Sequence, residues 1–204
     1  MPTYKFWLIA ISLLISNFSY SSIIDYYPYK ISPSASNYGN TGILETPNAR
    51  MMPEGQLRFN FSSSFPNEFT SLTASPFPWL EATYRYVEIK NVQYGPASYS
   101  GNQSLKDKGF DIKTLIKKET AYFPAVSIGF RDIAGSGEFS SEYIVSSKKF
   151  GPLDLSLGLG WGVLGTDNNI SNPLESFGDG FKTRDDTSEL GGSFTVSNWF
   201  SGNT

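Results

Sequence analysis

The strictest alternation of apolar with small or polar residues in this sequence is the run Leu153-Asp154-Leu155-Ser156-Leu157-Gly158-Leu159-Gly160-Trp161-Gly162. Leucine or tryptophan occupies every second position, and aspartate, serine or glycine fills the positions between. Because successive side chains of a β-strand point to opposite faces, the run predicts a strand with one apolar and one polar face. Such a strand extends over about 33 Å, enough to cross a lipid bilayer at a tilt.

The same period of two recurs along the chain and predicts seven strands in all. The other six predicted strands are residues 56–64, 79–88, 110–116, 125–131, 139–148 and 190–200. In the segment 139–148, the alternation places Tyr143 and Val145 on the apolar face and Glu142 on the polar face. Residues 91–108 and 165–188 are polar and are predicted to be loops. The sequence therefore predicts an all-β fold of antiparallel strands.

The first 55 residues differ from the rest of the chain. Lys5 is followed by an apolar run over residues 6–15 and then by small and polar residues to position 22, the order of a secretory signal peptide. That apolar run is too short for a membrane-spanning helix, which needs about 20 residues. We therefore expect a signal peptide at 1–22, an irregular segment at 23–55 and the strands of the fold at 56–204.

The composition excludes several classes of site. The 204 residues include no cysteine and no histidine, so the usual zinc sites, a thiol nucleophile, a Ser-His-Asp triad and a lipid-modified cysteine cannot be built from them. The formal net charge of -3 argues against a nucleic-acid partner, because phosphate binding needs clustered Lys and Arg. We expect no metal, no cofactor and no catalytic residues.

Two architectures accommodate strands of this kind. In a β-sandwich the apolar faces of two sheets pack together, which would suit a periplasmic or secreted binding module. In a transmembrane β-barrel the apolar face meets lipid and the polar face lines the lumen, with aromatic residues near the strand ends. The pattern alone leaves both open.

Motifs across residues 38–200 carry a resemblance to a known family, and three of them are nine or ten residues long. They are Gly42-Ile43-Leu44-Glu45-Thr46-Pro47-Asn48-Ala49-Arg50-Met51, Pro78-Trp79-Leu80-Glu81-Ala82-Thr83-Tyr84-Arg85-Tyr86 and Gly129-Phe130-Arg131-Asp132-Ile133-Ala134-Gly135-Ser136-Gly137. In these motifs the chain resembles the YjbH or GfcD-like family of exopolysaccharide-biosynthesis outer-membrane proteins. The resemblance implies a non-enzymatic β-barrel in the outer membrane of Gram-negative bacteria that serves exopolysaccharide or capsule biosynthesis and export.

The resemblance also implies partners and a length. The partners it implies are outer-membrane lipid, exopolysaccharide and other export proteins. Family members are typically several times longer, so the chain corresponds to the N-terminal portion of such a barrel. Seven strands agree with an incomplete barrel, because bacterial single-chain barrels have an even number.

The polar faces of the predicted strands supply the candidate binding residues. We predict that eight charged side chains line the lumen and guide or dock glycan: Arg58, Glu81, Arg85, Asp111, Lys113, Arg131, Glu142 and Asp154. The alternative is that they form salt-bridge networks that only fill the lumen. Next to Gly135-Ser136-Gly137, we expect Asp132 to cap backbone amides of a tight hairpin and Arg131 to pair with a carboxylate.

A carbohydrate-active hydrolase is a further alternative. Such enzymes hold two carboxyl groups about 5 to 9.5 Å apart across a sugar. Spacing in the sequence cannot show such a pair, although Glu81, Asp111, Glu142 and Asp154 are available to form one.

Overall fold

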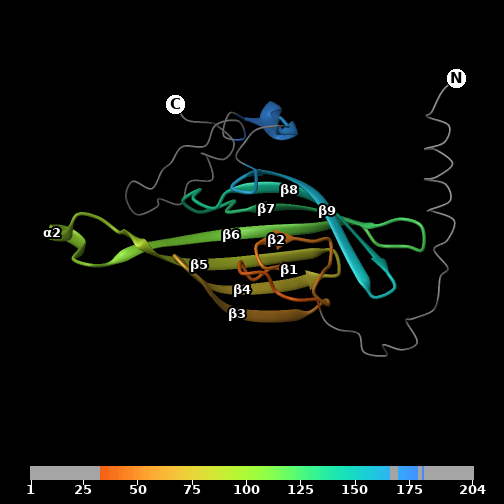
Figure 1. Ribbon diagram of the computed structural model, residues 1–204, viewed down its shortest axis with the longest axis horizontal. Helices are drawn as coiled ribbons and strands as arrows, with labels where there is room; N and C mark the ends of the chain where they lie inside the picture. Colours follow the sequence, from red (N-terminus) through yellow and green to blue (C-terminus); the bar gives the residue numbers. More distant parts are fainter. Residues whose placement is uncertain (1–32, 166–169, 179–180, 182–204) are drawn as a thin grey trace, which may run out of the picture.

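The fold is a seven-stranded antiparallel β-sheet, seen in a computed structural model that describes residues 33–165, 170–178 and 181 (Figure 1). The predicted signal peptide and the predicted strand 190–200 lie outside the described residues. The strands lie side by side in chain order, as expected for consecutive hairpins. They are β3 (Gln56–Ser64), β4 (Asn67–Phe77), β5 (Leu80–Gln93), β6 (Ser104–Lys117), β7 (Ala125–Arg131), β8 (Ser141–Phe150) and β9 (Leu153–Gly162).

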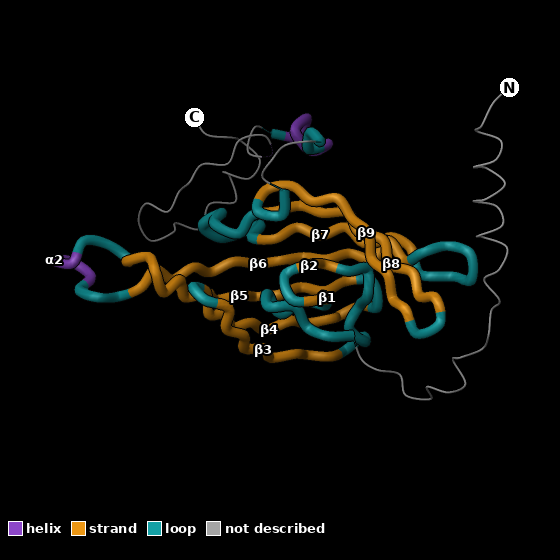
Figure 2. The backbone as a smooth tube through the Cα atoms, viewed as in Figure 1, coloured by secondary structure: helices purple, strands orange, loops and turns teal. Residues whose placement is uncertain are grey.

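Other secondary structure is sparse in the described part of the chain (Figure 2). A single helical turn, α2 (Ala97–Ser100), lies in the connection between β5 and β6, and a 3-10 turn, η2 (Pro173–Phe177), follows β9. Two short strands, β1 (Gly42–Ile43) and β2 (Thr46–Pro47), pair with each other. No helix among the described residues is long and apolar enough to span a membrane. The predicted all-β, antiparallel class is confirmed.

Two differences from the predicted strands have a physical reason. The strand β4 (Asn67–Phe77) was not predicted, because its two faces, rich in Thr and Ser, contrast too weakly in polarity to show a clear period of two. The predicted loop 91–108 is wrong at its start and end, where β5 continues to Gln93 and β6 begins at Ser104. The many charged residues there conceal a strand whose inward positions include Leu105.

The sheet has an inverted distribution of polarity. Thr73, Arg85 and Ser127, on the inner face, are 0% exposed, whereas Phe59 and Leu157, on the outer face, are 72% and 80% exposed. Strand alternation alone produces this difference, because the two sets of side chains leave the same strands in opposite directions. In the described residues no second sheet covers the apolar face, as the sandwich alternative would require.

The predicted faces of β8 are reversed in the structure. Glu142 is directly opposite Phe130 on β7 and Trp161 on β9, which places it on the outer face. Tyr143 therefore points to the inner face, where its ring lies over Gly129. The absence of a side chain at Gly129 leaves the room that this aromatic ring needs.

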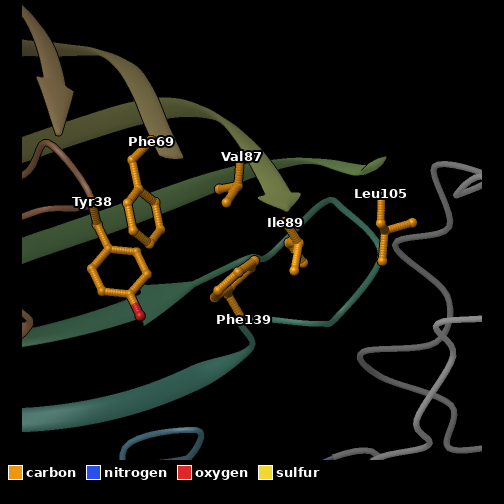
Figure 3. Packing of buried hydrophobic residues seen from close by; sticks show 6 residues of the cluster. All are labelled: Tyr38, Phe69, Val87, Ile89, Leu105 and Phe139. Atoms are coloured by element: carbon orange, nitrogen blue, oxygen red, sulfur yellow. The ribbon is translucent and has the colours of Figure 1, made fainter. Parts of the chain in front are cut away.

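A hydrophobic cluster lies on the inner face, near the end of the sheet from which the β5–β6 hairpin projects. It consists of Tyr38, Phe69, Val87, Ile89, Leu105 and Phe139, and Figure 3 shows these side chains converging. The ring centroids of Tyr38 and Phe69 are 5.1 Å apart, and those of Phe69 and Phe139 are 6.0 Å apart. Because Tyr38 precedes the sheet, this cluster joins the segment before β3 to the sheet.

Replacing Gly129 with alanine tests the packing of Tyr143. An added Cβ would lie 2.1 Å from Cζ of the Tyr143 ring, so Gly129→Ala should lower the free energy of unfolding by about 1–3 kcal/mol. Urea titration of the purified protein measures this. Gly95→Ala is the matched control, because its nearest atom would be 3.6 Å away, and it should change the free energy by less than about 0.5 kcal/mol. Equal effects of the two variants would contradict this packing.

Candidate functional site

The inner face of the sheet is occupied by residues 33–55, which we call the strap. The strap contains β1 and β2 and lies across β4, β5 and β6 in Figure 1. Its backbone lies against the face of the sheet that carries the buried polar side chains. The candidate site is therefore the polar inner face together with the segment that it holds.

An ion pair between neighbouring strands holds two parts of the strap. Glu81 on β5 is opposite Lys113 on β6, with Oε2 and Nζ 3.4 Å apart, and both side chains are fully buried. The Glu81 carboxylate accepts hydrogen bonds from the N–H of Thr41 at 2.9 Å and of Met52 at 2.6 Å. Lys113 Nζ donates to the carbonyls of Thr41 at 2.9 Å and Arg50 at 2.5 Å. Backbone polar groups of the strap thus satisfy both buried charges.

Hydroxyl groups of the strands make further bonds to the strap backbone. Ser62 on β3 donates to the carbonyl of Asn37 at 2.9 Å, and Ser75 on β4 donates to that of Met52 at 3.1 Å. Ser147 on β8 accepts from the N–H of Ala49 at 2.8 Å. These contacts span strands from β3 to β8, so the whole inner face takes part in holding the strap.

Arginines fasten the two ends of the strap. Arg58 on β3 donates to the carbonyl of Pro33 at 3.3 Å. Arg50 of the strap makes two hydrogen bonds to Asp154 on β9, at 2.9 Å from Nε and 2.6 Å from Nη2, and one of 2.5 Å to Glu119. Paired bonds of this kind between arginine and a carboxylate are directional and stronger than bonds between neutral groups.

Arg85 is the centre of a buried charge cluster. Three carboxylates, those of Asp107, Asp111 and Asp132, each lie 3.6 Å from one of its nitrogens. The guanidinium also lies 4.6 Å from the centroid of the Phe139 ring, a cation–π contact. The 3.6 Å distances to the carboxylates are longer than those of good hydrogen bonds. Arg85 is therefore held by ionic attraction and by the cation–π contact.

Asp132 begins the connection between β7 and β8 in a left-handed backbone conformation, with φ of 57°. Its carboxylate accepts a hydrogen bond from the N–H of Phe139 at 3.2 Å, as the predicted capping role requires. Burial raises the pKa of Asp132 to about 7, with Asp107 and Asp111 adding to the shift and Arg85 opposing it.

Arg131 makes contacts different from the expected pairing with a carboxylate. Its guanidinium lies 4.1 Å from the centroid of the Tyr38 ring and donates to the carbonyl of Glu45 at 2.9 Å. Both partners belong to the strap, so Arg131 also holds this segment.

The structure brings seven of the eight predicted residues to one face. Arg58, Glu81, Arg85, Asp111, Lys113, Arg131 and Asp154 lie on the inner face. Glu142 lies on the outer face and accepts a hydrogen bond from the side chain of Asn172 at 3.0 Å. Their role in binding glycan stays a prediction. In the part of the chain that the structure describes, no group of His, Cys, Asp or Glu side chains could hold a metal ion.

The composition of the strap concealed its importance. Its Pro, Asn, Ser and Gly residues predict irregular structure, and period-two patterns report only on the strands that they occupy. The one signal that marks it is the motif over residues 42–51, which lies within the strap and carries part of the family resemblance.

Comparison with known proteins identifies the family. The model of the family described as "Exopolysaccharide biosynthesis protein YbjH", abbreviated YjbH, matches residues 34–204. The chain belongs to the YjbH family. A relative from Escherichia coli (strain K12), named "Uncharacterized lipoprotein YjbH", is 42% identical over 193 residues, which cover 94% of this chain and 28% of the relative. The chain thus spans less than a third of the length of this YjbH protein. No solved structure matches the chain.

Removing Glu81 tests how the inner face holds the strap. Glu81→Ala leaves Lys113 buried without its ion-pair partner and two N–H groups without an acceptor, so it should lower the free energy of unfolding by about 3–5 kcal/mol. Glu68→Ala is the control, because the pair of Glu68 and Lys90 is partly exposed and should contribute no more than about 1 kcal/mol. Denaturant titration compares the two variants, and equal losses would contradict a role of Glu81 in holding the strap.

The raised pKa of Asp132 predicts a pH dependence of stability. The folded pKa of about 7 exceeds the unfolded value of about 3.9, so protonation favours the folded state. This stabilisation is complete below about pH 4 and is lost as the pH rises through about 7. Asp132→Asn resembles the protonated form and tolerates the same backbone conformation. The free energy of unfolding of Asp132→Asn, measured by denaturant titration relative to that of the unmodified protein, should rise between pH 4 and pH 8. If the two free energies changed with pH in the same way, the raised pKa of Asp132 would be contradicted.

Proposed function

We propose that these strands form part of the wall of an outer-membrane β-barrel whose polar interior docks or guides exopolysaccharide, without enzymatic activity. The observation that carries the proposal is the inverted sheet, which buries charged and hydroxyl side chains and exposes Leu and Phe. An exposed apolar surface of this kind is unfavourable in water and suits contact with lipid acyl chains.

Strand β9 shows the regular alternation of exposed leucines with small residues. Leu155, Leu157 and Leu159 are 55%, 80% and 48% exposed, and Ser156, Gly158 and Gly160 alternate with them. The residues on the other side of the same strand are therefore small or polar. Together these faces match the alternation of a strand between lipid and a polar lumen.

The apolar surface forms a band that runs obliquely across the strands. A row of directly opposed outer-face residues crosses the whole sheet and consists of Leu57, Ala74, Ala82, Ile112, Phe130, Glu142 and Trp161. From this row the exposed apolar residues of β3 extend in one direction to Phe61, and those of β9 extend in the opposite direction to Leu153. The band is therefore displaced along the strands from one edge of the sheet to the other.

This displacement gives the tilt of the strands relative to the band. Its centre moves from Phe59 on β3 to Leu157 on β9, a stagger of about one residue per strand. A shift of about 3.3 Å along the strand for every 4.8 Å across the sheet corresponds to a tilt of about 35°. Strands of transmembrane barrels are tilted by about 35–45°. If the apolar band lies parallel to the plane of a bilayer, the strands are therefore tilted by the angle that is typical of a transmembrane barrel.

The band also ends where a membrane boundary would lie. Beyond Tyr86 and Phe110, the outer face carries a row of polar residues formed by Ser63, Glu68, Glu88 and Lys106. Aromatic residues next to charged ones are typical of the interface between lipid and water. On this basis the β5–β6 hairpin, with α2 at its tip, projects out of the membrane (Figure 1).

The two edges of the sheet support a larger barrel. In the described residues β3 and β9 each pair with one neighbour, which leaves a row of backbone groups without strand partners. Such edges are costly in lipid, where each unsatisfied group costs several kcal/mol. Because the chain spans 28% of its YjbH relative, a longer family member offers the strands that would close the wall.

The inner face suits a hydroxyl-rich ligand. It combines carboxylates, ammonium and guanidinium groups and hydroxyls, which can donate to and accept from sugar hydroxyls. Glu81 and Glu142, two of the carboxylates considered for a hydrolase, lie on opposite faces of the sheet and cannot flank one sugar. Membership in an exopolysaccharide biosynthesis family supports the choice of glycan, and the name of the lipoprotein relative supports membrane association.

The experiment that tests this proposal is insertion into a membrane with a charge on the apolar band. Leu157→Arg should destabilise the folded, lipid-inserted protein by about 2–4 kcal/mol and reduce its recovery in the outer membrane. Ser63→Arg places the same side chain on the outer face beyond the band and should cost about 1 kcal/mol or less.

Cell fractionation and heat-modifiable gel migration of the full-length protein measure both effects. Recovery of the unmodified protein in the soluble periplasmic fraction would contradict the proposal, as would equal behaviour of the two arginine variants.

A further inference from the structure

The strap fills the inner face without joining the sheet. In the seven-stranded sheet, each strand from β3 to β9 pairs only with its neighbours in chain order. The strap strands β1 and β2 pair with each other. The backbone ladder of the described wall therefore does not use the strap. A wall built in this way could keep its hydrogen bonds if the strap moved.

Most contacts of the strap are of a replaceable kind. Side chains such as those of Glu81, Lys113 and Ser147 bond to its backbone N–H and C=O groups. The net contribution of a hydrogen bond is about 0.5–1.5 kcal/mol between neutral groups and about 1.5–3 kcal/mol when one group is charged, because water bonds to the same groups when the contact is lost. Hydroxyls of a sugar chain offer the same donors and acceptors as water and the peptide backbone.

Few apolar side chains anchor the strap. Tyr38, Ala49 and Met52 are buried, whereas Ile43 and Leu44 are 54% and 72% exposed. Tyr38 is the largest of these anchors and contacts Phe69 and Arg131 with its ring. The strap is thus attached at separate points and has no hydrophobic core of its own.

The course of the strap allows withdrawal toward one end of the sheet. Its first described residue, Pro33, contacts Arg58 near the start of β3, and its last residue, Gly55, immediately precedes β3. Gly55 has a φ of 76° and no atom within 4 Å of the position of an added Cβ, so the chain has room to turn there. The partly exposed ion pairs of Arg50 with Glu119 and Asp154 lie at this same end.

From these observations we infer that the strap is a plug, which occupies the polar inner face at rest and withdraws toward the start of β3 when a polysaccharide chain takes its place. The inference rests on the proposed barrel and specifies what its interior binds. The surface beneath the strap, with Glu81, Lys113, Ser62, Ser75 and Ser147, is the glycan-binding surface.

A disulfide between the strap and the sheet tests this directly, because the chain contains no cysteine of its own. Ala49→Cys combined with Ser147→Cys would join two residues whose backbone N and Oγ atoms are 2.8 Å apart. Ala74→Cys combined with Ala82→Cys is the matched control, which joins the opposed residues of β4 and β5 on the outer face.

The measurement is potassium chloride conductance of the full-length protein in planar bilayers, with each pair oxidised and then reduced. We expect the oxidised 49–147 pair to conduct about tenfold less than the reduced pair, because ions need a continuous polar path. The oxidised and reduced forms of the 74–82 pair should conduct equally. Equal conductance of the oxidised and reduced 49–147 pair, with the cross-link verified on a gel, would overturn the plug.

A second variant weakens the plug without a cross-link. Tyr38→Ala removes the ring that contacts Phe69 and Arg131, and it should raise conductance above that of the unmodified protein. Unchanged conductance in a Tyr38→Ala protein that still inserts would also contradict the inference. If the unmodified protein fails to insert into the outer membrane, the barrel proposal itself is wrong, and this outcome is distinguishable from a plug that does not move.

Discussion

The constraint on which this fold depends is that its buried face is polar. A sheet that buries Arg85, Lys113, Glu81 and Asp111 must pair each charge or supply it with hydrogen bonds, because an unpaired buried charge is strongly destabilising. The strands satisfy part of this demand among themselves. The strap supplies the rest with backbone groups, which bring donors and acceptors without adding charge.

The same constraint explains the outer face. Strand alternation allows only two faces, so polar residues directed inward leave Leu and Phe directed outward. In a water-soluble protein this would be an unstable arrangement, and in lipid it is the favourable one. The apolar band crosses the strands obliquely, so it is parallel to a membrane only if the strands are tilted. Tilted strands are also what a sheet needs to close into a barrel.

Much of this fold is predictable from the sequence, and the reasons for the failures are specific. Strands with strong contrast between their faces, such as 153–162, were predicted with their correct bounds. The strand Asn67–Phe77 was missed because Thr and Ser are compatible with either face. On β8 the faces were reversed, because Glu142 suggested a lumen position and only the pairing with Gly129 reveals that Tyr143 points inward. The strap was beyond prediction from periodicity, since its structure depends on contacts with strands far away in the sequence.

Labelling of single cysteines along β9 tests the central claim most directly. Cysteines at Leu155, Leu157 and Leu159 should react with a lipid-soluble maleimide and resist a charged one, because the proposed barrel directs these exposed positions to acyl chains. In a sheet covered by protein, both reagents would fail at these positions. Reaction of the same three positions with the charged reagent in intact outer membranes would place them in water and contradict the inverted, lipid-facing sheet.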